Sequence, residues 1–117
     1  MERAHDLLSS ARLLLDAGDT ASSVSRSYYA MFMAAEAALL TRQVAPGSHR
    51  GVVAAFGEHF VKTTLFERAD GRDLARAHEQ RVAAEYDPTT RVPAAEAEEL
   101  LGVARKFVAK VEAFLAR

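Results

Sequence analysis

Apolar residues recur at steps of three and four along most of the chain, and this spacing limits the fold more than any other feature of the sequence. The first segment shows it clearly, with Ala4, Leu7, Leu8, Ala11, Leu14 and Leu15. Such steps gather side chains on one face of an α-helix, whereas a half-buried strand alternates apolar and polar residues. No segment shows sustained alternation of that kind. The spacing therefore predicts an all-α protein.

Turn and capping residues mark where the first three helices begin and end. Gly18 is placed to end the first helix, and either Asp19 or Thr20 can cap the second. Pro46-Gly47 forms a turn, after which Ser48 is placed to cap the third helix. These signals predict helices over about residues 2–17, 20–42 and 49–64.

Two further helices follow a short connection at residues 65–70. Asp70 is placed to cap a helix over about residues 71–86. The segment 87–93 is expected to be a loop, because residues that precede proline avoid the α region. Pro93 suits the first turn of the last helix, which extends to about residue 115. Since short connections make neighbouring helices antiparallel, we predict an up-and-down bundle of four to five helices.

The size of the chain bears on its organisation. A length of 117 residues, half of them hydrophobic, predicts a single domain over residues 1–117. A domain this small is only marginally stable alone, so association through a helical face would be a natural supplement. The segment 20–42 is the most apolar of the predicted helices, and we expect it to be the most buried.

Charge and residue usage exclude several classes of protein. The formal net charge of −1 argues against broad electrostatic capture of nucleic acid. No apolar run approaches the roughly 20 residues that span a bilayer, and the start MERAHDLL has no signal-peptide core. We therefore expect a soluble, cytoplasmic protein that does not bind membranes. With no cysteine, no His-x-x-x-His pair and no acidic triad, we expect neither a metal site nor a cofactor.

Three short motifs occur in order on the predicted helices. The second helix contains Ser25-Arg26-Ser27-Tyr28-Tyr29-Ala30-Met31-Phe32. The third begins with Ser48-His49-Arg50-Gly51-Val52, and the fourth ends with Arg81-Val82-Ala83-Ala84-Glu85-Tyr86-Asp87. Together, over about residues 4–115, these motifs resemble the HEPN family, in particular small prokaryotic HEPN proteins that pair with minimal nucleotidyltransferases.

The resemblance implies a homodimer in which the second helices of two protomers face each other across a cleft. In active family members, an arginine followed after four to six residues by a histidine cleaves RNA there without a metal ion. An arginine can hold a phosphate, and a histidine can move protons near neutral pH. Counted from Arg26, the histidine position is occupied by Met33, which has no titratable group. Loss of positioned acid–base catalysis costs on the order of 10²- to 10⁴-fold.

The same resemblance implies a set of binding residues beside the cleft. They are Arg26, Tyr29, His49, Arg81, Glu85, Tyr86 and Asp87, and Arg26 is also the candidate catalytic residue. An Arg81–Asp87 or Arg26–Glu85 ion pair would order this site without taking part in chemistry. Tyr86 is in addition a candidate for modification by a partner enzyme.

Structural roles remain open for the same residues. Arg26 could form an ion pair at a helix interface, and Met33 could pack in a dimer seam. Tyr28 and Tyr29 could be packing residues whose hydroxyls reach polar partners. His49 could be structural, and the other histidines are expected to be surface or packing residues: His5, His59 and His78.

These observations lead to three hypotheses of function. The first is a dimeric HEPN protein in a nucleotidyltransferase-linked toxin–antitoxin or RNA- or nucleotide-binding system, without the usual ribonuclease chemistry. The second is a metal-independent ribonuclease toxin that uses Arg26 with another proton carrier, such as His49 or a tyrosine. The third is a nucleotide-binding or structural role outside toxin systems. The sequence does not distinguish a toxin from an antitoxin.

Overall fold

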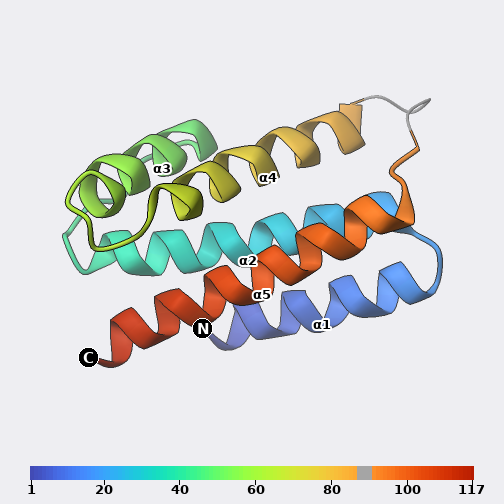
Figure 1. Ribbon diagram of the computed structural model, residues 1–117, viewed down its shortest axis with the longest axis horizontal. Coiled ribbons are helices and arrows are strands. Elements are labelled where there is room, and N and C mark those ends of the chain that lie inside the picture. The colour runs from blue at the N-terminus through green and yellow to red at the C-terminus, as the bar shows by residue number, and fades with distance from the viewer. Residues whose placement is uncertain (87–90) are drawn as a thin grey trace.

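The computed structural model describes residues 1–86 and 91–117, and within these ranges it contains helices and no strand (Figure 1). The prediction of an all-α helical bundle is confirmed. Most of the predicted loop at 87–93 lies outside the described residues. The elements are α1 (Glu2–Asp16), α2 (Thr20–Leu40), α3 (His49–Phe56), the π-helical segment η1 (Gly57–Val61), α4 (Arg68–Tyr86) and α5 (Ala94–Ala116).

Helix α2 lies at the centre of the bundle. It runs antiparallel to α1 and to α4, and α5 lies alongside it in the same direction (Figure 1). Its core-facing side is rich in small residues, and ten of its residues are buried, more than in any other helix. The small side chains let α1 and α5 approach closely, and buried Leu101, Ala104 and Val108 of α5 complete the core.

The first helix ends follow the predicted signals. Gly18 has a φ of 88°, the left-handed conformation that glycine adopts without strain. The Asp19 carboxylate accepts a hydrogen bond from the backbone N–H of Ser22 at 3.2 Å, which caps α2. Ser48 caps α3 in the same way, with its hydroxyl 2.9 Å from the N–H of Gly51. Residue type alone was sufficient to locate these boundaries.

Helix α4 begins earlier than predicted, and Asp70 does not precede it. The helix starts at Arg68, so Asp70 lies in its first turn. The Asp70 carboxylate reaches back to the N–H of Glu67 at 2.9 Å, and it also accepts hydrogen bonds from Lys110 of α5 at 2.8 and 3.0 Å. The capping function was predicted correctly, whereas the position of Asp70 relative to the helix start was wrong. Pro93 likewise lies just before α5 rather than inside its first turn.

The third predicted helix is divided in two. Regular α-helical geometry ends at Phe56, and the chain continues through the wider π turn of η1 as far as Val61. This turn keeps Phe60 fully buried, 5.4 Å from the ring of Phe56 and 5.7 Å from that of Phe66. The segment then ends at Thr64, which has a φ of 63° although β-branched residues rarely adopt it.

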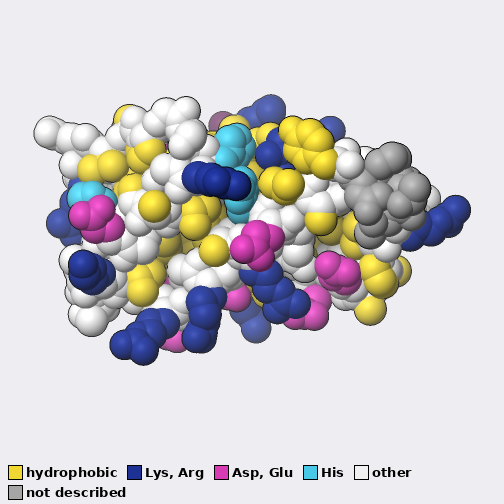
Figure 2. All heavy atoms as spheres, turned by 90° about the horizontal axis from the view of Figure 1, so that it is seen from above, with side chains coloured by type: hydrophobic (Ala, Val, Ile, Leu, Met, Phe, Trp, Pro, Cys, Tyr) yellow, Lys and Arg dark blue, Asp and Glu magenta, His cyan; other side chains and the backbone are white. Residues whose placement is uncertain are grey.

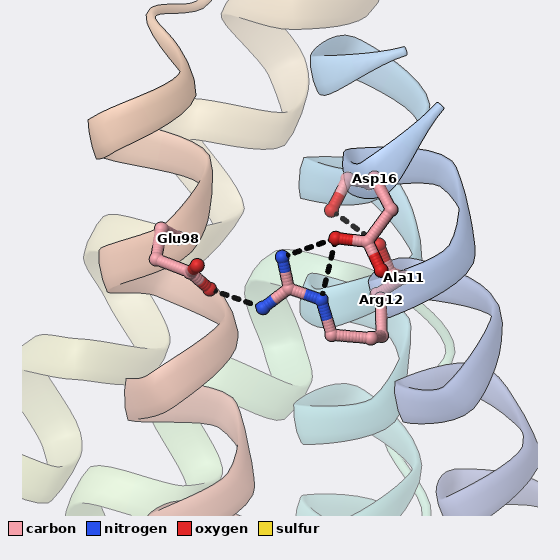
Figure 3. A network of polar contacts seen from close by, with 5 residues as sticks. Ala11, Arg12, Asp16 and Glu98 are labelled. Atoms are coloured by element: carbon pink, nitrogen blue, oxygen red, sulfur yellow. Dashed lines mark hydrogen bonds and ion pairs between the residues drawn. The ribbon is translucent and has the colours of Figure 1, made fainter. Parts of the chain in front are cut away.

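An ion-pair network joins α1 to α5 at the end of the bundle where α2 begins (Figure 3). The Arg12 guanidinium donates to Asp16 at 2.7 Å within α1, and to Glu98 of α5 at 2.6 Å. Next to it, the Ala11 carbonyl accepts a hydrogen bond from the buried Ser23 hydroxyl of α2 at 2.8 Å. These contacts hold three helices in register.

Candidate functional site

Three predicted site residues from three helices, Tyr29, His49 and Arg81, lie together. With three further side chains they form what we call the tyrosine–histidine cluster: Tyr28, Tyr29, Phe32, His49, His78 and Arg81. The His49 ring stacks on Phe32, with centroids 4.3 Å apart and planes at 19°. The His78 ring also lies near that of His49, with centroids 6.0 Å apart and planes at 22°. Helix α2 supplies the first three residues, the start of α3 supplies His49, and α4 supplies the last two.

A hydrogen bond between Tyr28 and His49 is the central polar contact of the cluster. The Tyr28 hydroxyl oxygen lies 2.6 Å from Nδ1 of His49. Tyr28 is fully buried, and burial raises the pKa of its hydroxyl well above the ordinary value. The hydroxyl is therefore protonated, and it donates to Nδ1 or accepts from it according to the tautomer of the His49 ring.

Arg81 links α4 to the two tyrosines. Its Nη2 donates a hydrogen bond to the Tyr29 hydroxyl at 2.9 Å, and its guanidinium carbon lies 5.2 Å from the centroid of the Tyr29 ring. The same Nη2 pairs with Glu85 at 3.0 Å, and the other Glu85 oxygen accepts from the Ser25 hydroxyl at 3.2 Å. With only 16% of its side chain exposed, Arg81 acts in this geometry as a fixed link between helices.

The predicted Arg26–Glu85 ion pair is wrong. Glu85 is held instead by Arg81 and Ser25. Arg26 is exposed and forms no ion pair with any described residue. Asp87 lies outside the described residues, so the Arg81–Asp87 pair stays a prediction.

The remaining predicted site residues lie at the edge of the cluster or outside it. Met33 is half-buried against the core and lies on the same side of α2 as Arg26 and Tyr29. Tyr86 is 75% exposed in the last turn of α4 and packs against none of the cluster rings. The structure therefore brings Tyr29, His49, Arg81 and Glu85 together, and it leaves Arg26 and Tyr86 on the surface.

His78 belongs to the site although its sequence context gave no indication of a binding role. Burial lowers the pKa of His78, and the charges of His49, Arg81 and Arg50 lower it further. It was expected to be a surface or packing residue, and its neighbours were not foreseen. One signal was available: His78 and Arg81 are three residues apart, so both lie on one face of a helix.

A groove between α3 and α4 adjoins the cluster. It has a volume of about 520 Å³, its floor is formed by aliphatic side chains such as Val53 and Val82, and Arg50, His78 and Glu79 provide its polar rim. Figure 2 looks onto the face formed by α3 and α4 and shows histidine side chains next to a basic side chain near its middle. The rim can therefore offer a cation and an imidazole to an anionic group, beside an apolar floor.

Two further findings concern other kinds of site. Among residues 1–86 and 91–117, no group of three or more His, Cys, Asp or Glu side chains is arranged to hold a metal ion. None of the described helices is both long and apolar enough to cross a membrane.

The fold and the site define a small helical bundle in which an Arg-x-x-Tyr segment of the second helix adjoins a histidine at the start of the third. A family model described as the HEPN domain matches residues 1–114, and the chain belongs to the HEPN family. The resemblance noted in the sequence is thereby confirmed over nearly the whole chain.

Curated relatives agree with this membership. The chain is 34% identical over 112 residues to "Putative toxin MJ0605" of Methanocaldococcus jannaschii, which covers 96% of this chain and 83% of the relative. It is 32% identical over 115 residues to "Putative toxin MJ0142" of the same archaeon, with 98% and 78% covered. It is also 33% identical over 118 residues to "UPF0332 protein glr0978" of Gloeobacter violaceus, with 100% and 94% covered.

Proposed function

We propose that this protein is the dimeric HEPN component of a toxin–antitoxin system, that it works with a minimal nucleotidyltransferase, and that it binds RNA rather than cleaving it. Two relatives that align with nearly the whole chain carry the word toxin in their names. These names support the assignment to a toxin–antitoxin system. The partner enzyme and the dimer are expectations from the HEPN resemblance. Binding without cleavage is inferred from this chain's own residues.

Met33 carries the argument against the usual chemistry. It occupies the position where active family members are expected to have histidine, on the same side of α2 as Arg26. Its thioether is half-buried against the core and can neither accept nor release a proton at any physiological pH. The scaffold therefore retains the arginine of the pair and lacks its proton carrier.

The tyrosine–histidine cluster and the adjoining groove supply groups suited to RNA. Arg50 and the His78 imidazole at the rim can contact a phosphate, and the apolar floor can take a base or a ribose. The contact is local, since the chain as a whole has a net charge of −1. We expect the RNA affinity to fall with salt concentration along a shallow slope, because only a few phosphates are neutralised.

A ribonuclease reaction is the second candidate, because one observation favours it. The His49 ring is fixed by Tyr28 through Nδ1, and a second imidazole, that of His78, lies with its centroid 6.0 Å away. Two imidazoles at such a distance could serve as acid and base, with Arg26 stabilising the developing charge. Cleavage by this route would require His49 and Arg26 and would be independent of metal ions.

RNA cleavage and RNA binding by matched variants separate the two candidates. We expect the wild-type protein to bind structured RNA without cleaving it, and we expect Met33→His to create or raise cleavage by restoring the missing proton carrier. Arg26→Ala in the Met33→His background should abolish that activity, while Arg105→Ala, which removes an exposed arginine on α5, should not. Metal-independent cleavage by the wild-type protein that is lost in both Arg26→Ala and His49→Ala would establish the second candidate instead.

Co-expression with the nucleotidyltransferase encoded next to it would test the partner. We expect a stable complex on gel filtration, and growth arrest by one component that the other relieves. If Tyr86 is the residue modified by that enzyme, intact-mass measurement should show a nucleotidyl adduct that Tyr86→Phe removes. Tyr86 is the exposed tyrosine of the three, whereas Tyr28 is buried and Tyr29 is half-buried. Absence of both a complex and an adduct would contradict the proposal that the nucleotidyltransferase is the partner of this protein.

A further inference from the structure

His78 has no counter-charge within the described part of its own chain. The residue is half-buried on α4 and lines the groove between α3 and α4. Its ring centroid lies 5.5 Å from that of Tyr28 and 6.0 Å from that of His49. It forms no ion pair with any carboxylate of residues 1–86 and 91–117. An imidazolium here would be a partly desolvated cation without an anion beside it, which costs free energy.

The charged groups near this ring are mostly cationic. They are His49 and Arg50 of α3 and Arg81 and Glu79 of α4, while α2 contributes the ring of Tyr28. Burial lowers the pKa of His78 first, positive charge on His49, Arg81 and Arg50 lowers it further, and a smaller effect of Glu79 opposes them. The Tyr28 hydroxyl adds no charge, because burial raises its pKa well above the ordinary value. His78 is therefore largely neutral at pH 7 in the unbound protein.

We propose that the groove binds an RNA phosphate together with one proton, which His78 takes up from the solvent as the phosphate arrives. This inference rests on the proposed RNA binding and adds its regulation, since binding then strengthens as the pH falls. It also gives His78 a specific role, that of the group whose charge is created by the ligand.

Arg50 and His78 together can hold the phosphate. Arg50 lines the same groove, is exposed and forms no ion pair with any described residue, so its guanidinium is available to a phosphate oxygen. Arg81 is already paired with Glu85 at 3.0 Å. An anion beside the His78 ring favours the charged form, so the pKa of His78 rises on binding. The protonated ring then donates a charge-assisted hydrogen bond, which is roughly twice as strong as a neutral one.

The linkage between proton and phosphate fixes the sign of the pH dependence. The complex holds more protons than the unbound protein, so the affinity must rise as the pH falls through the range in which His78 titrates. A phosphodiester keeps a fixed charge in that range, and the proton is therefore taken up by the protein. A phosphate held by arginine alone would bind equally well at each of these pH values, because arginine stays charged throughout.

The affinity for a short oligouridylate, measured by fluorescence anisotropy at constant ionic strength, tests the coupling. Neither uracil nor the phosphodiester titrates near neutral pH, so the probe itself contributes no proton. We expect Kd to fall by about tenfold from about pH 8 to about pH 6. His78→Gln should bind as the wild-type protein does at the higher pH and should gain no affinity at the lower one. His59→Gln, at a half-buried histidine of η1 that does not line the groove, should keep the wild-type pH dependence.

Two further measurements follow the proton itself. Isothermal titration calorimetry in buffers of different ionisation enthalpy should show proton uptake on RNA binding at pH 7, and none in His78→Gln. Histidine NMR should show that the pKa of His78 is higher in the complex than in the unbound protein. Arg50→Gln should raise the pKa of unbound His78, since one of the cations that lower it is removed, and should weaken RNA binding at every pH. Circular dichroism checks that each variant is folded at each pH.

The outcomes separate this inference from the proposed function. RNA binding whose Kd is independent of pH, or whose pH dependence and proton uptake persist in His78→Gln, would overturn the proton coupling and leave RNA binding standing. A wild-type protein that binds no RNA at any pH would overturn both.

Discussion

The Tyr28 hydroxyl oxygen lies 2.6 Å from Nδ1 of His49, and this contact ties the centre of α2 to the first turn of α3. The two residues are 21 positions apart, and the connection between the helices contains a sharp turn at Gln43, with φ at 59°. One hydrogen bond therefore fixes both the start of α3 and the orientation of the imidazole that faces His78.

Replacement of Tyr28 by phenylalanine should destabilise the protein while keeping its packing. The variant retains the buried ring and removes the hydroxyl, so that Nδ1 of His49 loses its partner. We expect the free energy of unfolding to fall by about 1 kcal/mol, the usual net contribution of one such bond. Urea unfolding, monitored by circular dichroism, measures this change in the free energy of unfolding. Tyr86→Phe, at an exposed tyrosine outside the cluster, is the control and should change stability by less than about 0.5 kcal/mol.

Asp70 should be among the most stabilising charged residues of the fold. Its carboxylate is 6% exposed, holds the Lys110 ammonium through both oxygens and accepts the N–H of Glu67. Asp70→Ala removes all three contacts, and we expect the free energy of unfolding to fall by about 2 kcal/mol. The loss is no larger because Lys110 stays partly hydrated. Glu99→Ala breaks only an exposed pair with Arg76 at 4.0 Å and should cost less than about 0.5 kcal/mol. Equal losses in the two variants would contradict the assignment.

The lowered pKa of His78 predicts the direction in which stability changes with pH. Its pKa is lowered below 6.5 in the folded protein, first by burial and then by the charges of His49, Arg81 and Arg50, against a smaller opposite effect of Glu79. A group with a lowered folded pKa binds fewer protons in the native state than in the unfolded chain. Its contribution to stability is therefore present above pH 6.5 and is lost as the pH falls through the folded pKa.

Unfolding measured at a series of pH values tests this expectation. The wild-type protein should lose stability between about pH 7 and pH 5, where a histidine titrates. His78→Gln should flatten the decline, since glutamine does not titrate in that range. His59→Gln, at a half-buried histidine on η1, is the control and should retain the wild-type slope. An unchanged slope in His78→Gln would show that other groups cause the decline.

Local residue chemistry was sufficient to predict most of the fold. Apolar spacing located the helices, and Asp19 and Ser48 gave their starts, because an N-cap depends on one side chain and the N–H groups beside it. The start of α4 was misplaced because Asp70 is anchored by Lys110, 40 residues away on another helix. The left-handed Thr64 was also unforeseen, since no residue preference favours threonine there.

The candidate site was predictable in part for the same reason. Arg81 and Glu85 are four residues apart on one helix, so their pairing follows from helix geometry, and both were named as site residues. The Tyr28–His49 bond and the place of His78 depend on how α2, α3 and α4 pack, which no spacing within one segment reveals. The expected Arg26–Glu85 pair failed because Arg81 and Ser25 hold the Glu85 carboxylate, while Arg26 remains exposed.

Two glycines of this chain should respond in opposite directions to the same substitution. Gly102 lies in the middle of α5, exposed, with no atom within 4 Å of an added Cβ, so Gly102→Ala should raise the free energy of unfolding by about 0.5–1 kcal/mol through helix propensity. Gly18 also has room for a Cβ, but its φ of 88° is strained for alanine, and Gly18→Ala should lower stability by about 1–2 kcal/mol. Thermal and urea unfolding of both variants measure the difference. A loss of stability in Gly102→Ala would mean that its exposed face on α5 is not free in solution.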